Sequence, residues 1–98
     1  SGGPNDVNAE SITFNKYVFS CGKPILGICY GHQIIAHQFG GSVVSSDSSE
    51  YGETKLVVLE KTGLFEGLNN DEIVWMNHGD TIGHPPVGFK TIGTSPDC

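Results

Sequence analysis

The ten residues from Pro24 to Gln33 restrict the possible fold of this chain more than any other stretch. Residues 24–28 form a short apolar run, as in a buried strand. Residues 34–39 carry apolar side chains at helical spacing and are followed by two glycines. Between them lies Cys29, with Gly27 two positions before it and Gly31 two positions after it. This pattern predicts a sharp strand-to-helix turn with a cysteine at its apex, where larger flanking side chains would collide.

Such a turn would make Cys29 a nucleophile. It lifts the sulfur out of the strand and leaves it at the N-terminus of a helix, where unpaired N–H groups and the helix dipole favour the reactive thiolate. The alternative is a small apolar filler of the core, which is the common role of a free cysteine. The two glycines and the strand-helix setting favour the nucleophile.

Composition excludes several classes of protein. The chain has 98 residues, enough for one small domain or part of a larger one, and a net charge of −6 from 5 basic and 11 acidic residues. This charge argues against a nucleic-acid or polybasic membrane surface, and we see no membrane span or signal peptide. Three cysteines without metal-ligand spacing predict a reduced, cytoplasmic protein with no metal site.

The remaining segments predict an α/β sheet with an added antiparallel part. The expected elements are a helix over 8–19, a short strand at 43–44, a polar loop over 45–50, a strand over 53–60, a turn or single helical turn over 63–68, a strand over 72–76, a polar break over 77–80, a loop at 85–86 and a final strand over 88–93. No closing element follows, so the sequence is interpreted as part of a larger domain.

Four motifs carry a resemblance to a known family. They are Ser1-Gly-Gly-Pro, Gly27-Ile-Cys-Tyr-Gly-His-Gln33, Glu50-Tyr-Gly52 and Val74-Trp-Met-Asn-His-Gly-Asp80. Their order and approximate spacing resemble those of class I (triad) glutamine amidotransferase domains along essentially all 98 residues, and the last two motifs look most like the GMP synthetase branch. The resemblance implies a flavodoxin-like, mostly parallel sheet with flanking helices and a small antiparallel addition, and a partial domain over 1–98 that is incomplete at both ends.

The resemblance also implies roles for individual residues. Cys29 resembles the nucleophile that attacks the side-chain amide of glutamine, and Gly3 and Tyr30 resemble the backbone donors of the oxyanion hole. The loop at 1–4 alone would be interpreted as an ordinary turn, and the resemblance turns it into a backbone segment that approaches the substrate. The implied substrate-binding residues are Gln33, Asn77, His78, Gly79 and Asp80. Relatives of the GMP type often carry serine at the position of Asn77.

The activity implied by the resemblance is glutamine hydrolysis through a cysteine thioester. The ammonia would go to an ATP-pyrophosphatase synthetase domain or subunit, for the synthesis of GMP from XMP. No cofactor is expected in this domain, because ATP and Mg²⁺ would belong to the synthetase. Alternatives are another class I amidotransferase, a γ-glutamyl hydrolase, or a non-catalytic remnant.

A base for the nucleophile is missing from the sequence. A cysteine of this type needs a histidine that is itself oriented by a carboxylate. His32 and His37 are expected to face solvent or the edge of their helix, and His78 falls in the substrate-binding segment. His84 precedes Pro85-Pro86 and lacks the acid of the family's His-Pro-Glu segment. We therefore expect the triad histidine and glutamate outside these 98 residues, and this segment alone to be inactive.

Overall fold

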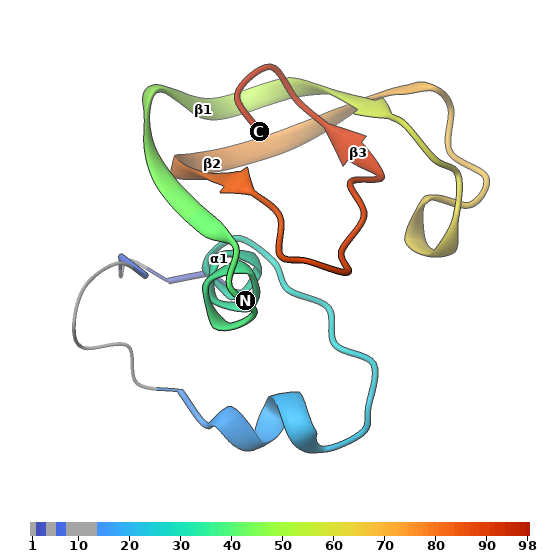
Figure 1. The fold of residues 1–98 in the computed structure, drawn as a ribbon. Helices are drawn as coiled ribbons and strands as arrows, with labels where there is room; N and C mark the ends of the chain where they lie inside the picture. Colours follow the sequence, from blue (N-terminus) through green and yellow to red (C-terminus); the bar gives the residue numbers. More distant parts are fainter. Residues whose placement is uncertain (1, 4–5, 8–13) are drawn as a thin grey trace.

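The structure, a computed structural model, describes residues 2–3, 6–7 and 14–98. Figure 1 shows a sheet with helix α1 lying against one end of it. The elements are the 3₁₀-helix η1 (Lys16–Ser20), helix α1 (Tyr30–Gln38), strand β1 (Ser42–Val58), the 3₁₀-helix η2 (Gly63–Phe65), strand β2 (Asp71–His84) and strand β3 (Gly93–Thr94). The described part of the chain is therefore α/β, as predicted.

The sheet is antiparallel in the described residues, with the order β2-β1-β3. Strands β1 and β2 form a long hairpin in which Ser42 pairs with His84 and Val57 pairs with Asp71. Aromatic and β-branched residues such as Val58, Val74 and Trp75 suit this pleated surface. The flavodoxin-like parallel sheet is not among the described strand pairs.

Two predicted interruptions are wrong, because both lie inside the hairpin. The expected loop over 45–50 belongs to β1, and the expected break over 77–80 belongs to β2. The register shifts between Ser45, which pairs with Asp80, and Glu50, which pairs with His78. Residues 46–49 therefore oppose Gly79 alone, and this bulge absorbs the polar stretch without ending the strand.

Two other predicted strands need correction. The run at 24–28 has no strand partner in the described residues, and the side chains of Leu26 and Ile28 are 61% and 58% exposed. A strand needs a neighbour for its backbone hydrogen bonds, and β1, β2 and β3 satisfy one another instead. The final strand expected over 88–93 is mostly loop and contributes only Gly93 to β3.

The helix predicted over 8–19 is shorter where it is described. Asn15 caps η1, because its Oδ1 accepts a hydrogen bond from the backbone N of Tyr17 at 3.0 Å. Residues 8–13 of the prediction lie outside the described residues. Within η1, Tyr17 is 69% exposed and Val18 is 45% exposed, so neither side chain is part of the core. The turn at η2 and the loop at 85–86 are confirmed.

Helix α1 follows the prediction closely. It ends before Gly40, whose φ of +84° favours glycine, and its buried Ala36 packs in the core with Val7 and Val43. Gly41 then begins the turn into β1, and a Cβ there would lie 2.7 Å from the backbone oxygen of His84. This close approach holds the C-terminal end of α1 beside the end of β2.

Candidate functional site

Cys29 lies at the apex of a strained turn. It is the only non-glycine residue with positive φ among those described, at +53°, and it directly precedes the first residue of α1. Such backbone strain is concentrated at functional sites and persists only where the surroundings enforce it. A Cβ at Gly27 would lie 2.6 Å from Cδ1 of Ile35 and 2.9 Å from the backbone oxygen of Gly31. The sharp turn into the helix and the need for glycine at position 27 are confirmed, whereas the strand expected before the turn is not formed in the described residues.

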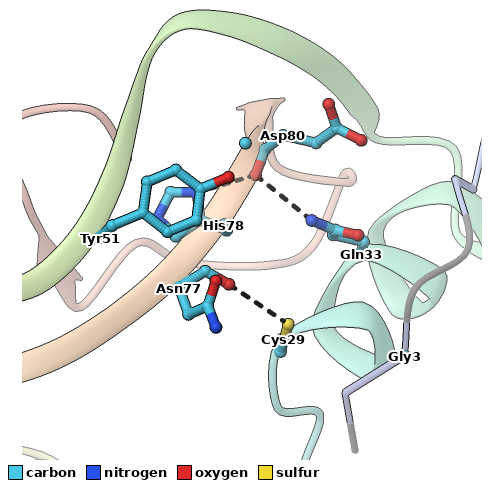
Figure 2. Close-up of a pocket in the computed structure, with 8 residues that line it drawn as sticks. Gly3, Cys29, Gln33, Tyr51, Asn77, His78 and Asp80 are labelled. Carbon is cyan, nitrogen blue, oxygen red and sulfur yellow. Dashed lines mark hydrogen bonds between the residues drawn. The ribbon is translucent and has the colours of Figure 1, made fainter.

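The turn directs the cysteine sulfur into a pocket of about 280 Å³. Figure 2 shows the sulfur at the start of α1 facing strand β2, where its Sγ lies 3.9 Å from the backbone oxygen of Asn77. Cys29 is exposed, which is the opposite of a core filler. The pocket is lined by Gly3, Cys29, Gln33, Tyr51, Asn77, His78, Gly79 and Asp80. Its volume is near the lower end of the range for small-molecule sites, about 300 Å³.

The structure thus brings together all but one of the residues singled out in the sequence. The exception is Tyr30, which is the first residue of α1 and does not line this pocket. It lies close by, since a Cβ at Gly3 would be 3.4 Å from Cδ1 of the Tyr30 ring. The donor roles expected for the backbone of Gly3 and Tyr30 stay predictions.

Gln33 joins the helix to the opposite wall of the pocket. It is buried in the first turns of α1, and its Nε2 donates a hydrogen bond to the backbone oxygen of Asp80 at 3.3 Å. The side chain of Asp80 points elsewhere, because its Oδ1 accepts a hydrogen bond from the hydroxyl of Ser45 at 2.9 Å. The pocket wall on β2 is therefore formed largely by backbone at residues 77–80.

The imidazole of His78 is held on both sides. Its Nδ1 lies 2.9 Å from the backbone oxygen of Asp80, and its Nε2 lies 2.9 Å from Oε2 of Glu50. The side chains of His78 and Glu50 are only 13% and 4% exposed, so this contact is well removed from water. The expectation that His78 is not the base for Cys29 agrees with this arrangement, because both ring nitrogens are already engaged.

A second, larger groove of about 1020 Å³ adjoins the pocket. Cys29 and His32, at the start of α1, are among the residues that line it. Desolvation lowers the pKa of His32, and the positive charge of His78 lowers it further. Within the described residues, the Sγ of Cys29 makes no hydrogen bond to a histidine. His37 is exposed, as expected, and His84 lies at the far end of β2, where its Nδ1 is 3.3 Å from Oγ of Ser42.

Sequence reasoning missed two contributors to this site. Tyr51 lines the pocket, and Glu50 lies behind it with only 6% of its surface exposed. Both belong to the Glu50-Tyr-Gly52 motif, which served only as a family signature. A buried glutamate inside a strand is unusual unless it is paired, and that signal appears only once the strand is known to continue through position 50.

The described residues contain no cluster of His, Cys, Asp or Glu that could hold a metal ion. Among the same residues, no helix has both the length and the apolar character needed to cross a membrane.

Comparisons with known proteins agree with the motifs. The family model for class-I glutamine amidotransferases matches residues 1–98. The GMP synthase [glutamine-hydrolyzing] of Geobacillus kaustophilus (strain HTA426) is 46% identical over 99 residues, and that of Aquifex aeolicus (strain VF5) is 44% identical over 96 residues. These matches cover 100% and 97% of this chain, which spans only 19% of either relative.

A solved structure gives the same indication. A Thermoplasma acidophilum protein, described as a candidate GMP synthase subunit, matches with a TM-score of 0.80 and 42% sequence identity. The match covers 85% of this chain and 42% of that protein. The chain is therefore similar to these proteins in sequence, and to the solved structure also in fold.

Proposed function

Because this chain belongs to the class I glutamine amidotransferase family, we propose that it carries the nucleophile and the substrate pocket of a glutaminase site. The observation that carries the proposal is the placement of Cys29. A strained backbone holds its sulfur at the N-terminus of α1, exposed to a pocket that residues 77–80 close on the other side. A helix N-terminus favours the thiolate that attacks the substrate.

The chemistry proceeds in two steps. The sulfur attacks the side-chain carbonyl carbon of glutamine, and the backbone N–H groups of Gly3 and Tyr30 stabilise the negative charge on the oxygen. Collapse of this intermediate breaks the C–N bond, and the nitrogen takes up a proton and leaves as ammonia. Water then hydrolyses the γ-glutamyl thioester to glutamate and restores the thiol of Cys29.

Substrate binding falls to the two walls of the pocket. Gln33 on α1 and the polar backbone of Asn77, His78, Gly79 and Asp80 on β2 would hold the amino and carboxyl ends of glutamine. The support for this assignment is that Gln33 and these four residues line one small pocket with Cys29. The histidine that accepts the thiol proton and its orienting glutamate would come from another part of the protein.

The whole protein is proposed to be a glutamine-hydrolysing GMP synthase. Two relatives that carry this name are 46% and 44% identical to the chain across nearly all of it. A synthetase domain or subunit, with ATP and Mg²⁺, would use the ammonia to convert XMP to GMP. Residues 1–98 would then be part of the glutaminase domain, and the three free cysteines support a reducing, cytoplasmic setting.

The family's flavodoxin-like parallel sheet is also proposed for the whole protein. Residues 24–28 would form one of its strands, which is supported by the exposed apolar side chains of Ile25, Leu26 and Ile28. Amide hydrogen exchange checks this proposal. The backbone amides of 25–28 should be protected in the longer protein and exchange rapidly in the 98-residue segment alone. Rapid exchange in both would contradict it.

Cysteine variants of the full protein test the proposed activity. Cys29→Ala should abolish ammonia release from glutamine, whereas synthesis with free ammonia should continue, because only the nucleophile is lost. Cys21→Ala is the matched control, since its thiol lies at the end of η1, where it donates to the backbone oxygen of Val18. Unchanged ammonia release by Cys29→Ala would overturn the proposal.

A glutamine-mimicking electrophile separates a glutaminase from other cysteine hydrolases. A chloroketone analogue of glutamine should label Cys29 and leave Cys21 and Cys98 unlabelled, and excess glutamine should slow the reaction. Labelling that glutamine does not slow would favour a different substrate for this pocket.

A further inference from the structure

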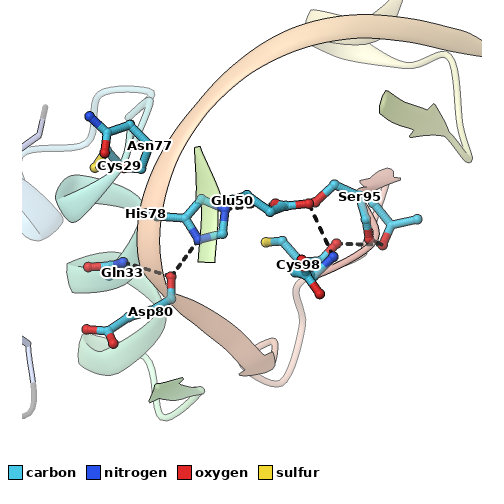
Figure 3. A network of polar contacts seen from close by, with 10 residues as sticks. Cys29, Gln33, Glu50, Asn77, His78, Asp80, Ser95 and Cys98 are labelled. Atoms are coloured by element: carbon cyan, nitrogen blue, oxygen red, sulfur yellow. Dashed lines mark hydrogen bonds and ion pairs between the residues drawn. The ribbon is translucent and has the colours of Figure 1, made fainter. Parts of the chain in front are cut away.

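The carboxylate of Glu50 is the most buried charged group in the described residues, and the chemistry above does not use it. Figure 3 shows that it lies behind the wall of the pocket, with the ring of His78 between it and Asp80. Three segments meet at this carboxylate. Its Oε2 is 2.9 Å from Nε2 of His78 and accepts a hydrogen bond from Oγ of Ser95 at 2.7 Å, and its Oε1 accepts one from the backbone N of Asp97 at 3.2 Å.

The hydrogen-bond partners determine the position of one ring hydrogen of His78. The backbone oxygen of Asp80 can only accept, so Nδ1 of His78 carries a hydrogen and donates to it. Nε2 faces Glu50, which already accepts hydrogen bonds from Ser95 and Asp97. Because Ser95 and Asp97 both donate to Glu50, the arrangement favours a carboxylate here, with the hydrogen of the Nε2 contact on His78.

The network continues from His78 to the pocket wall. The backbone oxygen of Asp80 accepts hydrogen bonds from His78 on one side and from Nε2 of Gln33 on the other. This single oxygen therefore joins the buried pair to helix α1. Glu50 also follows the bulge at 46–49, where β1 and β2 lose their regular pairing beside Gly79. The backbone pairing between β1 and β2 is therefore interrupted beside Gly79, where β2 lines the pocket.

We propose that Glu50 is a positioning residue of the glutamine site. Its buried carboxylate holds the imidazole of His78 against the turn at 95–98 and so fixes the β2 backbone at residues 77–80 opposite Cys29. The expected kinetic effect rests on the proposed glutaminase function. The hydrogen-bond network does not depend on that function. Breaking a buried, charged hydrogen-bonded pair is costly, and here the cost falls on the substrate-binding wall.

Kinetics of the full protein test the proposal. Glu50→Ala should raise the KM for glutamine about ten- to a hundredfold with a smaller change in kcat, because the binding wall moves while the turn at Cys29 is held separately by Gly27. Glu50→Gln should recover most of the loss, since its amide can donate to Nε2 of His78 and still accept from Asp97. Glu53→Ala is the control, an exposed glutamate on the same strand. An equal KM in the Glu50→Ala and Glu53→Ala variants would overturn the proposal.

Two further measurements keep the test decisive. If Glu50→Ala does not fold, Ser95→Ala removes one bond to the same carboxylate and should raise the KM about two- to tenfold, and an unchanged KM would overturn the proposal. Alkylation of Cys29 by iodoacetamide should proceed at the wild-type rate in Glu50→Gln. A large change in that rate would mean that Glu50 acts on the nucleophile instead of on the binding wall.

A spectroscopic signature separates this inference from the proposed function. In protein labelled with ¹⁵N-histidine, both ring N–H signals of His78 should be visible, and Glu50→Gln should remove the Nε2–H signal. His78→Gln assigns the signals. If the wild-type protein does not hydrolyse glutamine but shows both signals, the proposed function fails and the buried pair stands. Active wild-type protein with only one His78 ring N–H signal would overturn the pairing.

Discussion

At the scale of single residues, the candidate site depends on a backbone conformation that most side chains avoid. Cys29 adopts φ of +53° and ψ of −118°, and the surrounding residues must supply the free energy that holds it there. Gly27 makes the turn possible, because the helix lies against it where a side chain would be. The exposed sulfur is thus a product of local packing around the turn.

Replacing Gly27 tests this packing. Gly27→Ala should lower the free energy of unfolding by about 1–3 kcal/mol, because its Cβ would overlap Cδ1 of Ile35 and the backbone of the next helical turn. Urea denaturation of the full protein measures the change. Gly79→Ala is the matched control for stability, since its nearest neighbour would be Oγ of Ser49 at an ordinary 3.5 Å. Equal stability of the two variants would contradict the packing argument.

His32 should make the protein less stable in acid. Its pKa is lowered in the folded state, mainly by desolvation and also by His78, so the unfolded chain binds more protons just below pH 6.5. Stability should therefore fall as the pH drops through that region, and His32→Gln should lose less stability over the same interval. Denaturation midpoints at pH 7.5 and pH 5.5 measure the difference. A steeper loss in the variant would contradict the direction of the shift.

At the scale of elements, the β1–β2 hairpin builds the binding wall. Polar residues at 45–50 and 77–80 look like loops because they interrupt the apolar alternation, yet each continues a strand. The hairpin keeps its pairing on both sides of the bulge, and residues 77–80 of β2 line the pocket beside it. Tertiary pairing therefore overrides the local preference for a turn.

The surface charges of the hairpin should matter little for stability. Lys55 and Asp71 form an ion pair at 2.9 Å, but each side chain is 55% exposed. Because such pairs are screened by water and salt, Lys55→Met should change the free energy of unfolding by no more than about 1 kcal/mol. A double-mutant cycle with Asp71→Asn isolates the pair. A coupling energy of several kcal/mol would contradict this expectation.

At the scale of the whole molecule, the segment buries little of its surface. It exposes 6842 Å², whereas a folded chain of 10.4 kDa exposes about 5,400 Å² by the usual scaling with mass. Among the described residues the buried hydrophobic core consists of Val7, Ala36, Val43 and Val58. Large apolar side chains such as Trp75, at 78%, and Leu26, at 61%, are exposed instead.

This small core predicts marginal stability for the 98 residues alone. The isolated segment should unfold over a broad, low temperature range when followed by circular dichroism, because too little apolar surface is buried to offset the chain entropy. The full protein supplies the comparison under the same conditions. A sharp, cooperative transition of the isolated segment at high temperature would contradict the prediction.

The sequence alone determined the parts of this protein that depend on neighbouring residues. Gly27, Cys29 and the apolar spacing of 34–39 specify the turn and the helix, because steric limits and helical periodicity act over a few positions. The motifs likewise identified the residues that meet in the pocket around Cys29, apart from Tyr51. Only the tertiary structure decided how the strands pair, that the run at 24–28 has no partner among the described strands, and that Glu50 is buried against His78. Those features depend on contacts between residues far apart in the chain, which no local pattern specifies.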